Sequence, residues 1–303
     1  MIVKEWIKAA RLRTLPLSVS GIIVGSSYAY YQGFENWKIV VLALLTTLGF
    51  QVLSNFANDY GDGVKGTDNE NRVGPQRAIQ SGAISVQEMK TGIIITSLFS
   101  LLSAVLLIYV SFGKENFGYS LLFFILGIAS IVAAIKYTVG KGAYGYSGFG
   151  DIFVFVFFGL VSVLGSNFLF TKQFDWFLVL PAIAIGFLSV AVLNLNNMRD
   201  IENDKNSNKN TIVVKMGLQN AKYYHYFIVT SAIVLIVAFS VIVEISIFPA
   251  LFLSVLMFRH LRTVYKAQTY TDFDPELKKV ALGTFALAIL FFIFLVLLKI
   301  YKF

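Results

Sequence analysis

Long apolar runs alternate with short polar segments along the whole chain. Most runs hold about twenty residues, enough for a helix to cross a hydrocarbon core of about 30 Å at a rise of about 1.5 Å per residue. We predict nine such helices, at 14–31, 37–57, 91–112, 117–137, 150–170, 175–196, 222–243, 245–260 and 279–300. The pattern predicts an all-α, polytopic membrane protein, with residues 1–303 forming a single transmembrane domain.

The composition agrees with a chain that is surrounded by lipid. Hydrophobic residues make up 57% of it and charged residues 14%, whereas soluble domains have about 45–50% and about 25%. The chain contains no cysteine, which excludes disulfides, thiolate catalysis and cysteine metal sites. It has two histidines, His225 and His260, too few for a multi-histidine zinc site, and we expect both at the membrane interface.

Basic residues gather in alternate loops. With a cytoplasmic N-terminus, segments 1–13, 58–90, 138–149, 197–221 and 261–278 face inward, and 20 lysines and arginines lie inside against 5 outside. This positive-inside bias predicts a bacterial inner-membrane protein whose N-terminus and long polar loops are cytoplasmic and whose C-terminus is outside. The same bias accounts for the net charge of +8, so we predict no nucleic-acid partner.

Two clusters of Asp and Asn close the second and sixth predicted helices on this inner side. They comprise Asn55, Asn58, Asp59, Asp62 and Asp68 in the first cluster, and Asn194, Asn196, Asn197, Asp200 and Asp204 in the second. Helical spacing of three or four residues predicts that each set lies on one helix face. Like charges at that spacing repel, and they are costly beside lipid, so something must neutralise them.

Clustered oxygen ligands without His or Cys suit a hard cation such as Mg²⁺, which usually completes its shell with substrate phosphate. The clusters occupy matching positions 141 residues apart, from Asp59 to Asp200, which indicates a diverged internal duplication. We therefore predict two four-helix units plus one helix around a central cavity, with the carboxylate sets opposite each other across it. Solvated acidic loops balanced by lysines are the simpler alternative.

Basic side chains accompany both clusters. Arg77 follows the first cluster and Lys209 the second, while Tyr137 and Lys141 end the fourth predicted helix four residues apart. Cations beside a bound metal suit a diphosphate, whose remaining charge they neutralise. Taken singly, each of these side chains would also fit a role in membrane topology or at the interface.

These motifs resemble the UbiA superfamily of intramembrane aromatic prenyltransferases, over essentially the whole chain. The residues that match its two Asp-rich motifs and its Tyr-x-x-x-Lys motif are Asn58, Asp59, Asp62 and Asp68, then Asp200 and Asp204, then Tyr137 and Lys141. One departure is that Asp68 stands six residues beyond Asp62, where four is commoner.

Further stretches are most similar to the branch of that superfamily that prenylates 1,4-dihydroxy-2-naphthoate in menaquinone synthesis. They are Arg11-Leu-Arg13-Thr14-Leu-Pro16, Gly74-Pro75-Gln-Arg77, Tyr146-Ser-Gly148-Phe-Gly150-Asp151, and Asn196-Asn197-Met-Arg199-Asp200 with Lys209-Asn-Thr211. A second departure is Asn208, which stands where a glycine usually precedes the lysine.

The resemblance implies roles for these residues. Mg²⁺ would be held by Asp59, Asp62, Asp200 and Asp204, with Asp68 as a further ligand, while Asn58, Asn196 and Asn197 would orient the carboxylates. Counter-charges for the diphosphate would come from Arg13, Arg77, Lys141 and Lys209, with Tyr137 beside them.

The implied reaction transfers a polyprenyl group from its diphosphate to 1,4-dihydroxy-2-naphthoate with loss of CO₂, giving a demethylmenaquinone. An apolar, aromatic-rich cavity would shield the allylic cation from water. The same machinery with another acceptor, such as 4-hydroxybenzoate, is the nearest alternative. A membrane transporter is a distant one, because a transporter would place ionisable residues near mid-membrane, whereas here the acids gather at one face.

Overall fold

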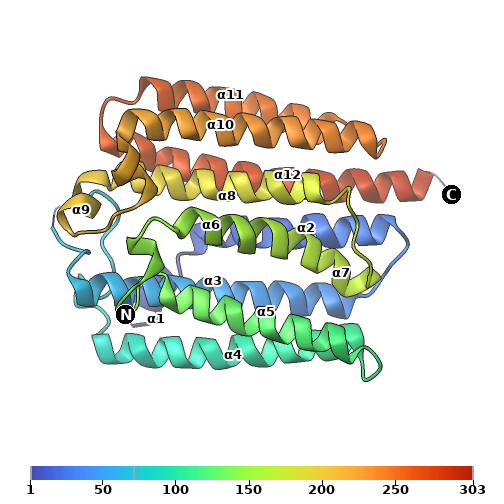
Figure 1. Cartoon of the computed structure of the whole chain (residues 1–303), viewed down its shortest axis with the longest axis horizontal. Helices are drawn as coiled ribbons and strands as arrows, with labels where there is room; N and C mark the ends of the chain where they lie inside the picture. Colours follow the sequence, from blue (N-terminus) through green and yellow to red (C-terminus); the bar gives the residue numbers. More distant parts are fainter. Residues whose placement is uncertain (1, 71, 302–303) are drawn as a thin grey trace.

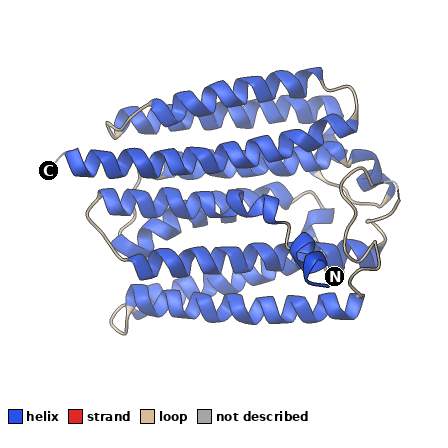
Figure 2. Ribbon diagram, turned by 180° about the vertical axis from the view of Figure 1, so that it is seen from behind, coloured by secondary structure: helices blue, strands red, loops and turns tan. Residues whose placement is uncertain are grey.

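The computed structural model describes residues 2–70 and 72–301, without the side chains of Ile2 and Arg13, and over this part of the chain every regular element is helical (Figure 2). The elements in chain order are α1 (Ile2–Ala9), η1 (Leu12–Thr14), α2 (Leu15–Tyr31), α3 (Trp37–Lys65), α4 (Val86–Phe112), α5 (Phe117–Lys136), η2 (Tyr144–Tyr146), α6 (Gly150–Val154), the π-helix η3 (Phe155–Gly165), α7 (Ser166–Thr171), α8 (Val179–Arg199), α9 (Ile201–Asn206), α10 (Ile212–Ile242), α11 (Phe248–Lys266), η4 (Tyr270–Phe273) and α12 (Asp274–Tyr301).

Seven helical segments are long and apolar enough to cross a membrane, and they fall on seven of the predicted spans. They are α3, α4, α5, the continuous α6–η3–α7 segment, α8, α10, and α12 with its preceding turn η4. Helices also occupy the other two predicted spans, but α2 has 17 residues, and α11 has 19 with several charges near its end. The all-α membrane fold is therefore confirmed, and the count of nine spans stays a prediction.

The long helices run side by side, and the two chain termini lie at opposite ends of the bundle (Figure 1). Helix α3 packs along α4, α8 along α10, and α12 along α2, so the last long helix closes the bundle against the first. The short helices α1 and α9 and the loop that follows α3 lie together at one end (Figure 1). Both Asp clusters belong to this end.

Small residues allow two of these helices to approach closely. A Cβ atom added at Gly21 would lie 2.2 Å from Ser162 Oγ, and one at Gly25 would lie 2.1 Å from Ser166 Oγ. Small residues at such contacts let helix backbones pack tightly where no hydrophobic effect drives association. The partner surface is the π-helix η3 and the start of α7, so α2 packs against the irregular stretch of the fifth predicted span.

A cavity of about 310 Å³ is lined by residues between Ser18 and Leu193. Its walls come from α2, α3, α4, α5 and the α6–η3–α7 segment, and Leu193 is its contribution from α8. The described parts of α10, α11 and α12 do not line this space, so this cavity is surrounded by fewer helices than the predicted nine. Instead, these helices and α8 bury large side chains such as Leu188, Phe239 and Phe291 in a continuous core.

The expected interfacial position of the two histidines is also wrong. His225 is fully buried and His260 is 1% exposed, and their Nε2 atoms lie 2.8 Å apart. His225 Nδ1 pairs with Asn194 Oδ1 at 3.2 Å, and His260 Nδ1 pairs with Glu276 Oε2 at 2.6 Å. This histidine chain, Asn194–His225–His260–Glu276, links α8, α10, α11 and α12, which shows that it belongs to the core.

Candidate active site

The first carboxylate set lies at the end of α3. This helix continues eight residues beyond residue 57, where the predicted span ends. Asp59 and Asp62 therefore lie on its last two turns, and both are buried. Gly66 then ends the helix with a left-handed φ of 73°, a conformation that glycine adopts without strain. The turn brings Asp68 back toward the helix, where its backbone N–H donates to Asp62 O at 3.4 Å.

The second set lies at the junction of α8 and α9. Asp200 has φ −99° and ψ 13°, outside the helical range, so it separates the two helices, and Asp204 lies on α9. The prediction that Asn196, Asp200 and Asp204 share one continuous helix face is therefore wrong. The amide of Asp204 still donates to Asp200 O at 2.8 Å, so the two carboxylates remain one turn apart and buried.

Two cations join the sets. Lys209 Nζ lies 3.6 Å from both Asp62 Oδ2 and Asp204 Oδ1, while Arg72 lies 3.1 Å from Asp68 Oδ1 and 3.5 Å from Asp200 Oδ2. A third link comes from Asn203, whose Nδ2 donates to Thr67 O at 2.9 Å. The structure thus brings together two carboxylate sets that lie 141 residues apart in the sequence, from Asp59 to Asp200.

The two carboxylate sets and the basic side chains that pair with them are called the acid–base site below, and further arginines belong to it. Asp59 accepts from Arg11 and from Arg77 NH1, the latter at 2.9 Å. Arg199 donates from Nε and NH2 to the two oxygens of Asp200, and from NH1 to Asp274 at the start of α12. Sequence reasoning assigned a role to Arg77 and none to Arg11, Arg72 or Arg199, although Arg11 and Arg199 stand within stretches that it singled out and Arg72 lies two residues before Gly74.

Burial and neighbouring charges set the ionisation of the groups outside the predicted spans. Burial and the nearby negative charge of Asp62 raise the pKa of Asp68 to about 7. Burial raises the pKa of Asp204 to about 6. Burial also acts on Asp200, but the hydrogen bonds and charge of Arg199 outweigh it and lower its pKa. Burial disfavours the charged form of Lys209, but the negative charges of Asp62 and Asp204 outweigh it and raise the pKa of Lys209 well above the ordinary value.

The donor set fits a hard cation. Three buried oxygens, Asp68 Oδ2, Asp204 Oδ2 and Asn203 Oδ1, have no hydrogen-bond partner within the described chain. Unpaired buried acceptors are costly, and oxygen-only ligands are those that Mg²⁺ selects. As the side chains stand, no three His, Cys, Asp or Glu groups among the described residues converge on one point, because the arginines and Lys209 draw each carboxylate toward themselves.

Aromatic and amide side chains connect the acid–base site to the cavity. Tyr146 donates to Asp62 Oδ1 at 2.8 Å and pairs with Thr67 Oγ1 at 2.6 Å. Asn58 lines the cavity one residue before Asp59, and its Oδ1 accepts from Thr138 at 3.4 Å. Tyr137 also lines the cavity, so the space reaches the end of α3 and α5 that adjoins the first carboxylate set.

Other predicted residues lie at varied distances from this network. Asn196 supports Arg199, whose NH2 donates to its Oδ1 at 2.9 Å, and Asn197 is buried on α8. Lys141 is exposed in the turn after α5, beside Tyr60 and Lys65, and the described chain gives it no ion pair with an acidic residue. Tyr137 and Lys141 therefore do not converge on one point. The side chain of Arg13, another predicted counter-charge, lies outside the described residues.

Comparisons with known proteins agree with this arrangement. The chain is 45% identical to the 1,4-dihydroxy-2-naphthoate octaprenyltransferase of Haemophilus influenzae and 41% identical to that of Escherichia coli, in each case over 95% of this chain and 94% of the relative.

Among solved structures, a UbiA homolog from Aeropyrum pernix has the same fold, with a TM-score of 0.69 at 15% identity over 92% of this chain and 98% of that one. A UbiA homolog from Archaeoglobus fulgidus, solved with GPP and Mg²⁺, gives 0.61 at 14% identity over 96% and 99%. The model of the UbiA prenyltransferase family matches residues 18–279. Together with the buried carboxylate sets and the adjoining cavity, this match shows that the chain belongs to the UbiA prenyltransferase family.

Proposed function

We propose that this integral membrane protein transfers a polyprenyl group from a polyprenyl diphosphate to 1,4-dihydroxy-2-naphthoate. The C–O bond to the diphosphate breaks, a C–C bond to the ring forms, and the ring carboxyl leaves as CO₂, which gives the reduced form of a demethylmenaquinone. The observation that carries the proposal is the pair of buried carboxylate sets, bridged by Lys209 and Arg72, together with an apolar cavity lined by Asn58, the residue before Asp59. The identity of the relatives supports the choice of acceptor.

Mg²⁺ would be held by Asp59, Asp62, Asp68, Asp200 and Asp204. When bound, the metal would neutralise the charge that grows on the diphosphate leaving group. The unpaired oxygens of Asp68 and Asp204 support this assignment. Arg72, Arg77 and Lys209, which neutralise the carboxylates in the metal-free protein, are also within reach of a bound diphosphate and would take part of its charge.

The cavity would protect the reactive allylic cation. Phe50, Phe157 and Phe158 lie on its walls, and apolar side chains from α4 and α5 continue them away from the carboxylates. Water is poorly accommodated among such groups, so the aromatic acceptor competes with little water for the cation. The prenyl chain would extend along the apolar part of the cavity and into lipid.

We further propose that all nine long helical segments cross the bilayer as a single domain. The opposite positions of the two termini in the bundle support an odd number of crossings (Figure 1). The excess of lysine and arginine in the loops at the end that carries the acid–base site supports a cytoplasmic position for that end and for the N-terminus, with the C-terminus outside.

The test is a reconstituted assay. Purified protein in lipid nanodiscs would be supplied with Mg²⁺, a polyprenyl diphosphate and either 1,4-dihydroxy-2-naphthoate or 4-hydroxybenzoate, and the products would be separated by mass. We expect a prenylated product lighter by CO₂ with the naphthoate, and none after EDTA treatment until Mg²⁺ is restored. Preferential use of 4-hydroxybenzoate would overturn the assignment of 1,4-dihydroxy-2-naphthoate as the acceptor. Turnover in the presence of EDTA would overturn the requirement for Mg²⁺.

A further inference from the structure

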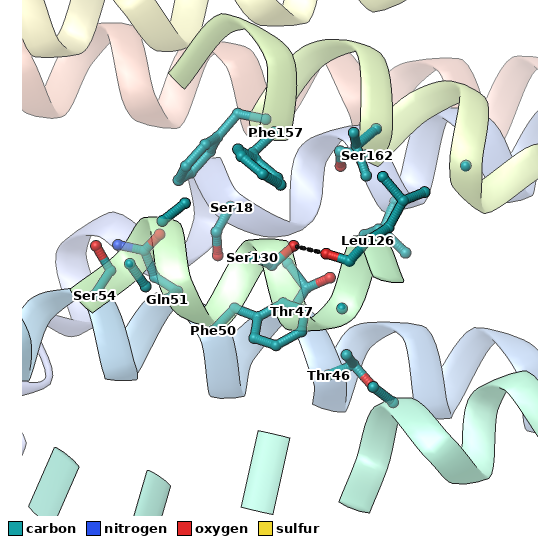
Figure 3. Close-up of a pocket in the computed structure, with 18 of the residues that line it drawn as sticks. Ser18, Thr46, Thr47, Phe50, Gln51, Ser54, Leu126, Ser130, Phe157 and Ser162 are labelled. Carbon is teal, nitrogen blue, oxygen red and sulfur yellow. Dashed lines mark hydrogen bonds between the residues drawn. The ribbon is translucent and has the colours of Figure 1, made fainter. Parts of the chain in front are cut away.

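Two buried polar atoms in the cavity wall have no hydrogen-bond partner in the described chain: the hydroxyl of Ser162, which can itself donate, and an amide oxygen of Gln51, which can only accept. Gln51 on α3 lines the cavity, and its Oε1 is buried with no hydrogen-bond partner in the described chain. The neighbouring hydroxyls of Ser18 and Ser130 donate to the backbone carbonyls of Leu15 and Leu126, each at 2.8 Å. Figure 3 shows Gln51 beside Ser54 on one wall of this space, with Ser18, Ser130 and Phe157 around it.

The surrounding hydrogen bonds determine which end of the Gln51 amide is free. Asn55 Nδ2 donates to the carbonyl of Ala10 at 2.8 Å, so Asn55 Oδ1 is the accepting end of that side chain. The Thr14 hydroxyl donates to Arg11 O at 2.9 Å and is therefore left to accept. Gln51 must present its NH₂ group to both, at 3.4 Å to Asn55 Oδ1 and 3.3 Å to Thr14 Oγ1. Its oxygen is then the end without a partner.

An amide oxygen accepts hydrogen bonds and cannot donate them, so the missing partner must be a donor. Among the substrates proposed above, the isoprenoid chain has no donor, and an ionised diphosphate has none either. The dihydroxynaphthoate carries two hydroxyl groups. Gln51 also lies two helical turns before Asp59, about 12 Å along α3, which leaves room for the diphosphate and the reacting carbon between them.

On the basis of the proposed function, we infer that Gln51 is a specificity-determining residue whose Oε1 accepts a hydrogen bond from a ring hydroxyl of the aromatic acceptor. The network of Asn55 and Thr14 holds the amide in place before the acceptor arrives. A site built in this way discriminates strongly against an analogue that lacks the hydroxyl, because the buried oxygen then stays unpaired.

The experiment compares wild type with Gln51→Met, which keeps the length of the side chain and removes the amide. For each, we would measure KM for the dihydroxynaphthoate acceptor and for the polyprenyl diphosphate, together with the inhibition constants of 1-hydroxy-2-naphthoate and 4-hydroxy-2-naphthoate. In wild type, one of these analogues should bind about 10–100-fold more weakly than the other. In Gln51→Met this ratio should fall toward one and KM for the acceptor should rise by a similar factor, with KM for the diphosphate unchanged.

Gln219→Met on the exposed start of α10 is the matched control and should change none of these values. Gln51→Leu removes the same accepting oxygen with a different side-chain shape, and we expect it to lower the ratio between the two analogues in the same way, which covers the case in which Gln51→Met does not fold. An unchanged ratio in Gln51→Met would overturn the inference and would indicate a water molecule as the partner. An equal rise in KM for both substrates would also overturn it, while prenyl transfer by wild type keeps the proposed function intact.

Discussion

Two buried polar networks in this protein have opposite characters. In the acid–base site, carboxylates from α3 and α9 are paired with arginines and Lys209, yet Asp68 and Asp204 each keep an oxygen without a partner in the described chain. In the histidine chain, each side chain is hydrogen-bonded to the next, from Asn194 to Glu276. The first network borders the cavity, and the second is enclosed by α8, α10, α11 and α12.

The difference shows which buried polar groups indicate function. Burial of a charged or polar side chain is costly in both networks. In the histidine chain, every charged or ring group is hydrogen-bonded to a neighbour and Asn194 Nδ2 alone lacks a partner in the described residues, so the chain connects four helices without calling for a metal ion. The acid–base site leaves two carboxylate oxygens, Asp68 Oδ2 and Asp204 Oδ2, without a partner in the described chain, so we expect a bound cation to complete it. Unpaired carboxylate oxygens, rather than buried charge alone, therefore distinguish the proposed reactive site here.

The largest effect should come from removing a carboxylate in the acid–base site. Asp59→Asn or Asp200→Asn leaves the shape of the site but removes a negative charge that would hold the metal, so we expect prenyl transfer to fall by about 1,000-fold or more. Initial rates in nanodiscs at saturating Mg²⁺ measure this. Glu115→Gln, an exposed acid in the loop between α4 and α5, is the control and should be fully active. Near-normal turnover in either Asp variant would contradict the assignment.

A smaller effect should come from pH. In the metal-free protein burial raises the pKa of Asp68 to about 7 and that of Asp204 to about 6, so both carboxylates take up protons as the pH falls below these values. Mg²⁺ binds the ionised form and must displace those protons. The dissociation constant for Mg²⁺ should therefore be flat above about pH 8 and rise below about pH 7, approaching about tenfold per pH unit for each proton displaced.

Isothermal titration calorimetry in buffers of different ionisation enthalpy would count the protons released on Mg²⁺ binding. Asp68→Asn should abolish the step near pH 7 and leave the step near pH 6. If Mg²⁺ binding at about pH 6 releases no protons, the carboxylates are not the ligands.

The smallest effect on turnover should come from the histidine chain. His260→Leu leaves the buried Glu276 without its imidazole partner, which should cost about 3 kcal/mol of stability and lower the Tm by about 5–10 °C. The turnover of the folded fraction should stay within about twofold of wild type. Scanning fluorimetry and rates per folded enzyme measure the two quantities, and Thr263→Leu, exposed on the same helix, is the control. A large loss of turnover at unchanged Tm would place the chain in the reaction instead.

Much of the molecule follows from local sequence. The apolar runs predicted the positions of the long helices, because a backbone in lipid must satisfy its own hydrogen bonds and a helix does so within one segment. The Asp and Asn clusters likewise indicated a cation site, since bare carboxylates at helical spacing repel one another. Both inferences depend on neighbours within a few residues, which a sequence displays directly.

Tertiary structure decided what depends on segments far apart in the chain. It selected Arg11, Arg72 and Arg199 as partners of the carboxylates, and it left Lys141 in an exposed turn. It also placed the cavity among α2 to α8 and gathered both histidines into one core. Spacing along a helix defines which face a side chain occupies, but only the packing of the other helices decides what that face meets.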